Sequence, residues 1–348
     1  MNISTIGKYV DQPIILNKLD KKMPALLIGA GGLYGIADSF IHSKKEHNKK
    51  RFLQNGIVIA STIAASLIGT RGLKIGNKKI IKGLMESTPL KNLQDLQKNA
   101  VERFLNVVQV ADENILNALE RAKTRELTPK QIDLLINQLP TSPEKKELLK
   151  VLLPDKKNLN SREIFSEVKR LSLLGLVPIV GGVAGGIVAD KVVGSHDKKG
   201  TANKIKEGLY QYLANIFLCN IGAGAALYIF ERLEKSGKIK PLGPMGKLAV
   251  IFGGITTTGI VGGSYIANYI SKKVIDPMFG QKNNGRLYGE RKPEALDIAL
   301  HSDDIATAGI LSGFKWIEPT LPALYFISGY RAGIGYRNVE HKKNTKVA

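Results

Sequence analysis

The sequence predicts an all-α, polytopic helical membrane protein with about six apolar helices, arranged as three helical-hairpin repeats, and an inserted soluble helical bundle. Three observations predict this fold class. Several long stretches carry no charged side chain, a short phrase beside such stretches occurs more than once, and one long polar region has the spacing of amphipathic helices. Because a helix rises about 1.5 Å per residue, about 20 apolar residues cross the hydrocarbon core of a bilayer.

Three apolar stretches predict membrane helices most directly. Residues 248–271 carry no charge over 24 residues, residues 208–230 are also uncharged, and residues 171–189 are shorter but more apolar. Three further stretches are less apolar, and each of them alone could be a buried helix of a soluble protein. Because the three stronger stretches are present, we expect these to enter the membrane as well. The weaker stretches are 24–41, 56–70 and 305–330.

A repeated phrase suggests how these stretches are organised. Residues 36–38 read IAD and residues 188–190 read VAD, and a histidine and a pair of lysines follow each; residues 266–268 read IAN, a fainter copy. A glycine-rich apolar run comes before each copy, and a basic connector and a second apolar run come after it. Repetition on this scale indicates one supersecondary unit copied several times. The alternative is chance likeness between basic sequences that flank membrane helices.

The region 77–170 differs from the rest, because it is polar and rich in signals for helix ends. Thr128 followed by Gln131 forms a capping-box pattern, and Ser142 precedes a proline in a second start signal. The region is predicted to be a small helical bundle in water or, alternatively, a partner-binding arm. The predicted segments are then 1–76 (polar leader and first hairpin), 77–170 (insert), 171–245 (second hairpin), 246–335 (third hairpin) and 336–348 (basic tail).

The net charge of +21 favours anionic partners. Beside so many apolar stretches, the lipid bilayer with anionic headgroups is the simplest of these partners. Nucleic acid is a less favoured partner, because basic and aromatic residues are not interleaved and no nucleic-acid-binding motif is present. The single cysteine, Cys219, excludes an intrachain disulfide.

Lysine and arginine occur at similar density in all connectors, so the positive-inside rule does not select an orientation. No cleavable signal peptide is evident. We expect a multi-pass location in an inner or plasma membrane, with the insert and both termini in the cytoplasm.

Small residues four apart are predicted to let the helices pack closely in the membrane. Such pairs create a groove where two backbones approach, which matters where water cannot drive association. The alternative is that the glycines mark broken or re-entrant segments. The glycines predicted to pack helices are Gly31, Gly35, Gly181, Gly182, Gly185, Gly186, Gly222, Gly259, Gly263, Gly309 and Gly313.

Two groups of residues are candidates for binding a substrate. Lys315 and Glu318 are charges inside an apolar stretch, three residues apart and followed by Pro319, which is typical of a broken membrane helix with an ion site. The alternative places this junction at the membrane interface. Asp38, Asp190 and Asn268 occupy equivalent positions of the repeat and could form a polar ring. The alternative is interfacial solvation and local pairing with the lysines that follow.

No motif for catalysis, a metal or a cofactor is present in the sequence. The histidines lack metal-ligand spacing, and neither a phosphate-binding loop nor a nucleophile elbow occurs. The run GAGGLYG (29–35) resembles a dinucleotide fingerprint only superficially, and helix packing explains it better. The sequence therefore predicts a non-enzymatic protein without a metal or cofactor.

The layout of three two-helix units resembles that of the mitochondrial carrier family, but the Pro-x-[Asp/Glu]-x-x-[Lys/Arg] signature is absent from all three units. No substrate or site residue is transferred from that family. The leading functional hypothesis is a membrane-organising or partner-docking protein. The alternatives are a transporter or channel-like protein for a small or anionic solute, and a basic nucleic-acid-binding protein.

Overall fold

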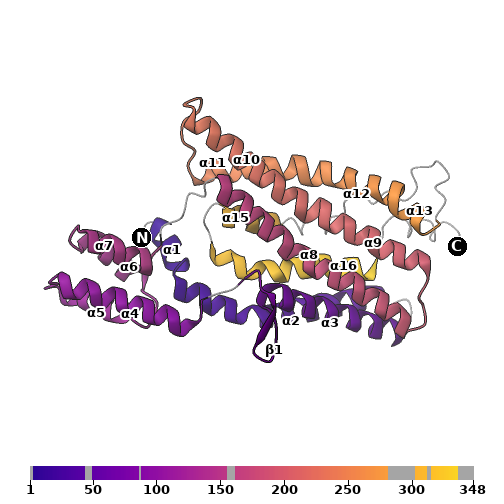
Figure 1. The fold of residues 1–348 in the computed structure, drawn as a ribbon, viewed down its shortest axis with the longest axis horizontal. Coiled ribbons are helices and arrows are strands. Elements are labelled where there is room, and N and C mark those ends of the chain that lie inside the picture. Colours follow the sequence, from indigo (N-terminus) through magenta and orange to yellow (C-terminus); the bar gives the residue numbers. More distant parts are fainter. Residues whose placement is uncertain are drawn as a thin grey trace. The chain divides into compact units, whose positions relative to one another are not determined.

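The computed structural model describes residues 3–43, 49–85, 88–154, 161–280, 302–311 and 315–335 (Figure 1). These residues are helical apart from connectors and one short β-hairpin, which confirms the prediction of a helical chain. By contact clustering, the chain divides into two compact units. Unit 1 comprises Met1–Met23, Ser87–Asn158 and Gly313–Pro319, and unit 2 comprises Pro24–Glu86, Leu159–Ser312 and Thr320–Ala348.

Unit 1 is a small bundle of short amphipathic helices around an aliphatic core. The core centres on Phe104, Leu119, Ile132 and Leu148, all of which are almost fully buried. The predicted capping box is present, because the Thr128 side chain accepts from the Gln131 N–H and the Gln131 side chain accepts in return. The unit contains α1 (Ile3–Val10), the start of α2 (Pro13–Ser43), α4 (Leu90–Val107), α5 (Glu113–Ala122), α6 (Pro129–Gln138), α7 (Pro143–Leu152) and part of the 3₁₀ segment η4 (Lys315–Thr320).

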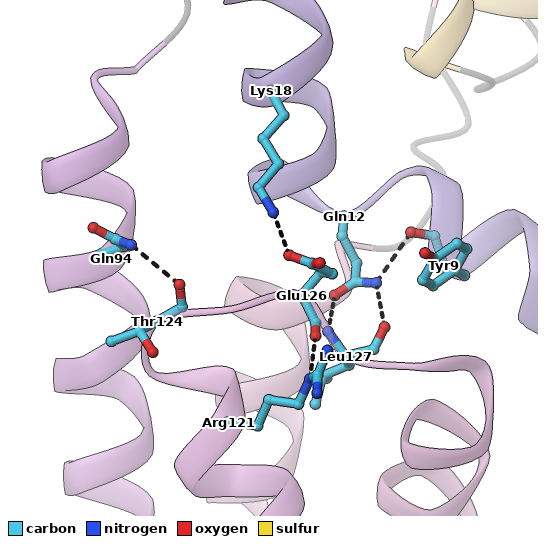
Figure 2. Close-up of polar contacts among 8 residues, drawn as sticks. All are labelled: Tyr9, Gln12, Lys18, Gln94, Arg121, Thr124, Glu126 and Leu127. Atoms are coloured by element: carbon cyan, nitrogen blue, oxygen red, sulfur yellow. Dashed lines mark hydrogen bonds and ion pairs between the residues drawn. The ribbon is translucent and has the colours of Figure 1, made fainter.

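The N-terminal leader is part of this bundle, as Figure 2 shows. Buried Gln12 accepts from the Leu127 N–H at 2.7 Å and donates to the Leu127 carbonyl at 2.9 Å. Lys18 donates to Glu126 at 2.6 Å, and the Glu126 carbonyl accepts from Arg121 Nε at 2.8 Å. Because a buried polar group must be bonded, Gln12 fixes the leader against the loop between α5 and α6.

Unit 2 holds the long apolar helices. Within the described part of the chain, four helices are long and apolar enough to cross a membrane: Lys50–Arg71, Glu163–Val192, Lys198–Lys235 and Gly246–Met278. The predicted stretch 24–41 lies in α2, and the stretch 305–330 is divided among α15, η4 and α16. The arrangement as six spans in three repeated hairpins stays a prediction.

The elements of unit 2 follow the chain from the second part of α2. After α3 and a β-hairpin, the chain forms α8, two long helical segments that contain π-helical turns, and two shorter helices. Their bounds are α3 (Lys49–Arg71), β1 (Gly72–Ile75), β2 (Lys78–Lys82), α8 (Ser161–Val192), α9 (Lys198–Tyr212), η1 (Leu213–Phe217), α10 (Leu218–Lys235), α11 (Pro244–Ile255), η2 (Thr256–Gly263), α12 (Ser264–Ile270), η3 (Ser271–Ile275), α13 (Asp276–Met278), α15 (Ser302–Leu311) and α16 (Leu321–Ile334).

The β-hairpin was not predicted from the sequence. Strands β1 and β2 pair antiparallel, with Leu73 opposite Ile81, and two residues, Gly76 and Asn77, connect them. Gly76 has φ of 58°, a conformation that glycine adopts without strain. A Gly-Asn pair between two short segments that contain isoleucine is a hairpin signal, so the sequence carried this information.

Helix α8 packs against α3 on one side and α16 on another. A Cβ added at Gly181 or Gly185 would overlap Ala65 and Ser61 of α3. A Cβ added at Gly182 would instead overlap the carbonyl of Gly329 in α16, and Ser61 Oγ donates to the Gly181 carbonyl at 3.0 Å. Two adjacent glycine grooves therefore bring three backbones into direct contact.

The other glycines predicted to pack helices also lie at close contacts, as far as they are described. Gly31 and Gly35 of α2 face Ile63 and Ile59 of α3. Gly309 is buried in α15, and Gly313 lies outside the described residues. The remaining contacts are Gly186 with Gly333, Gly222 with Gly254, Gly259 with Cys219, and Gly263 with Ala214.

We expect Gly182→Ala to destabilise the protein, because the new methyl group would overlap the α16 backbone, and backbone relief costs about 1–3 kcal/mol. The matched control is Gly29→Ala, where a Cβ meets nothing within 4 Å and helix propensity favours alanine. Thermal unfolding of the two purified variants in detergent measures the difference. Equal melting temperatures would contradict the packing described for α8.

Unit 1 gives a pH-dependent prediction. The hydrogen bond from Lys18 lowers the pKa of Glu126 below its usual range. The pKa of Glu126 is therefore lower in the folded state than in the unfolded state. The Lys18–Glu126 pair stabilises the fold at pH values above the unfolded-state pKa. This stabilisation is lost as the pH falls through the lowered folded-state pKa. We expect Lys18→Met to raise the pKa of Glu126 toward its ordinary range in an NMR carboxyl titration. Identical titration curves for the two proteins would show that the pair has no effect.

Candidate functional site

One long helical segment of unit 2, Lys198–Lys235, carries a row of buried polar side chains. The segment consists of α9, η1 and α10 in direct succession. The buried side chains follow one another at spacings of four, four, four and five residues. We call them the polar line: Asn203, Glu207, Gln211, Asn215 and Asn220.

The last spacing is longer because a π-helical turn lies within it. The Leu218 N–H bonds to the Leu213 carbonyl, five residues back instead of four. A π-turn contains about one more residue than an α-turn, so Asn220 stays on the same face as Asn215. An unbroken α-helix would rotate Asn220 away from the line.

Hydrogen bonds join three members of the polar line to one another, and a fourth member bonds to α8. Gln211 Nε2 donates to Glu207 Oε1 at 2.9 Å, and Asn215 Nδ2 donates to Gln211 Oε1 at 2.8 Å. Asn220 Nδ2 donates to Ser172 Oγ of α8 at 3.2 Å. Glu207 has no exposed surface, so a potentially charged group lies inside the helix packing of unit 2. Satisfied networks of this kind hold their side chains in one arrangement.

Beside the start of the polar line lies a buried ion pair. Lys204 Nζ lies 2.5 Å from Asp190 Oδ2, and the two residues are only 4% and 3% exposed. Gln54 of α3 donates to the other carboxylate oxygen of Asp190. The aliphatic part of Lys204 packs at Gly186 and at Gly335, where α16 ends in a left-handed conformation with φ of 67°. The pair therefore depends on glycines that leave room for the lysine side chain.

A cavity of about 300 Å³ opens next to this ion pair. Lys50, Arg51, Gln54, Asn55 and Ser195 are among its lining residues. Gln54 lines the cavity and also bonds to Asp190, so the cavity is connected to the buried pair through one side chain. Its two basic side chains suit an anion or the negative end of a polar solute.

A second buried ion pair fixes α9 to the last long helical segment. Lys206 Nζ lies 2.8 Å from Asp276 Oδ1, and both side chains are about nine-tenths buried. One turn further on, the hydroxyl groups of Tyr210 and Ser264 are 3.1 Å apart. Buried charges cost desolvation energy unless they are paired, so these contacts determine which face of α9 meets α12 and α13.

At the Asn220 end of the polar line lies another polar group. Asp303 and Asp304 of α15 are both buried. The Tyr325 hydroxyl of α16 interacts with the side chains of Thr307 and Asn220 and lies within the electrostatic influence of both carboxyls. Polar groups therefore lie at both ends of the line as well as along it.

The residues that the sequence predicted to bind a substrate differ from one another in burial and in location. Asp190 is buried and pairs with Lys204, not with the exposed lysines that follow it directly. Asn268 is half-buried in α12, and the side chain of Asp38 in α2 lies outside the described side chains. Lys315 is exposed and Glu318 is half-buried in η4, and both belong to unit 1. The polar ring and the Lys315–Glu318 site stay predictions.

Sequence reasoning missed the polar line, although a signal for it existed. The stretch 208–230 predicts a membrane helix because it is long and contains no charge. Its amides at 211, 215 and 220 nevertheless repeat at helical spacing. Glu207 and Asp304 lie one residue outside the stretches 208–230 and 305–330, so a search limited to apolar runs excluded both. No protein-family model, curated protein or solved structure matches this chain.

We expect Lys204→Met to destabilise the protein strongly, because it leaves the Asp190 carboxylate buried without its charged partner. Breaking a buried pair in this way costs about 3–5 kcal/mol. The double variant Asp190→Asn with Lys204→Met removes both charges and should be less destabilised than the sum of the two single variants. Denaturant unfolding of the four proteins measures this coupling, and additive effects would contradict the pairing.

Proposed function

We propose that this chain is a multi-pass membrane protein that passes a small ion or polar solute along the polar line. The observation that supports this proposal is the presence of a buried carboxyl and four buried amides on one face of a helix long and apolar enough to span a bilayer. Ionisable side chains within membrane helices are costly and usually mark an ion or solute path. The sequence alone favoured a membrane-organising role. The buried side chains of the polar line favour transport instead.

The length of the polar line supports a path across the membrane. From Asn203 to Asn220 it covers 17 residue steps, which correspond to about 25 Å along a helix. The hydrocarbon core of a bilayer is about 30 Å thick, so the line would cover most of it. The carboxyls of α15 lie near the Asn220 end of the line, where they could attract a cation.

The π-turn supports the same proposal. It lies within the last spacing of the line and keeps Asn220 aligned with the other members. Single π-turns inside α-helices occur frequently at functional sites, because they use backbone energy to orient a side chain. Glu207 is the member that could carry charge, so we expect it to bind or relay the ion.

Partner docking by unit 1 is the second candidate. A groove of about 440 Å³ lies on unit 1 and has apolar walls at Phe104, Val107 and Val151, with Glu144 and Glu147 beside them. Val107 is 68% exposed and offers an apolar surface at the edge of this groove. This groove supports the membrane-organising or docking role that the sequence favoured.

Ion flux into proteoliposomes tests the first candidate. We expect wild-type vesicles to pass protons or alkali cations faster than protein-free vesicles. Replacing the buried carboxyl, Glu207→Gln, should slow this flux at least about tenfold, which corresponds to a barrier about 1.4 kcal/mol higher. The matched control is Glu231→Gln, because Glu231 lies on the same helical segment but pairs with the exposed Lys235. This control should pass ions at nearly the wild-type rate.

Two results would contradict transport along the line. One is flux that Glu207→Gln leaves unchanged in folded, inserted protein. The other is a wild-type chain that inserts but passes nothing above the lipid background. The second result would leave docking through unit 1 as the better supported function.

A further inference from the structure

A group of buried oxygen atoms around Asp303 forms a possible ligand set outside the polar line. Asp303 and Asp304 lie in the first turn of α15 and are 3% and 2% exposed. Side chains of α16 and of α10, which is remote in sequence, lie near them. Two adjacent buried carboxyls repel each other if both are ionised, so one of them must be protonated or a cation must lie nearby.

The immediate surroundings of Asp303 do not supply that charge. Among the described residues, Asp303 Oδ1 is buried and has no hydrogen-bond partner. The groups that act on the Asp303 carboxyl are the Asp304 carboxyl and two backbone N–H groups, and no basic side chain of the described chain is among them. A buried carboxylate oxygen without a partner is unfavourable, which indicates that the structure leaves a place for a cation.

Neutral oxygen ligands are present beside the carboxyls. The Tyr325 hydroxyl interacts with Thr307 and Asn220 and lies within the influence of Asp303. Asn220 donates through Nδ2 to Ser172, so its amide oxygen is left to accept or coordinate. Carboxylate, hydroxyl and amide oxygens are the ligands that hard cations prefer.

The small number of open ligand atoms favours a monovalent cation. The Cys219 thiol donates to the Ala214 carbonyl and lies near the Asp304 side chain, and Asp304 has an interaction of its own in the structure. One carboxylate oxygen, on Asp303, remains open. We propose that Asp303 binds an alkali cation here, with Asp304, Tyr325, Thr307 and Asn220 supplying further oxygen atoms. This site goes beyond the proposed passage, because cation binding can be measured on the purified chain whether or not the chain transports anything.

The melting temperature of the full-length chain in detergent tests this site. Sodium chloride or potassium chloride is titrated against choline chloride at constant ionic strength. A cation that binds only the folded protein stabilises it and raises its melting temperature. Once the cation concentration exceeds the dissociation constant, this rise grows with the logarithm of the concentration. We expect such a rise in the wild type and none in Asp303→Asn. The control Asp276→Asn removes another buried carboxyl, one that is paired with Lys206, and should keep the rise.

A second variant keeps the proposal testable if Asp303→Asn does not fold. Tyr325→Phe removes one neutral oxygen and should raise the half-saturating sodium concentration at least about tenfold, while the response stays saturable. The proposal is overturned if alkali salts act no differently from choline chloride. It is equally overturned if folded Asp303→Asn keeps the wild-type response, or if Tyr325→Phe does not change the half-saturating concentration. A stability that depends on pH alone would indicate a proton instead of an alkali cation.

Discussion

The close approach of α8 to both α3 and α16 is the contact on which the rest of unit 2 depends. Four glycines of α8 form two adjacent grooves, and a methyl group in either would overlap a neighbouring helix. In a bilayer, packing and hydrogen bonds hold helices together, because the lipid is as apolar as the side chains. The same close approach lets Lys204 of α9 reach Asp190 at the end of α8.

The glycine contacts and the buried polar groups of unit 2 support each other energetically. The polar groups of α9 and α10 would be costly if lipid tails reached them, and α8 and α16 both pack against α9. The ion pairs of Lys204 and Lys206 then fix the rotation of α9, since each lysine has its carboxylate on a different neighbouring element. Small residues allow the helices to approach, and polar contacts determine which faces meet.

Local features of this chain could be predicted from sequence, and long-range pairings could not. The capping box at Thr128 and the long apolar helices follow from neighbouring residues, so the sequence predicts them directly. The contacts of Gln12 with Leu127 and of Lys204 with Asp190 depend on which segments meet in space. The polar line could not be recognised from hydropathy, because the amides within the stretch 208–230, such as Gln211, lower its mean hydropathy only slightly. The π-turn also changes the spacing of these amides from four residues to five.

The central claim is that the segment Lys198–Lys235 crosses the bilayer with its polar line enclosed by other helices. Its two ends carry exposed serines, Ser195 and Ser236. Single cysteines at these positions, in a Cys219→Ala background, can be labelled with a membrane-impermeant maleimide in sealed vesicles of one orientation. The account predicts labelling of the two positions from opposite faces of the membrane. Labelling of both from the same face would contradict it.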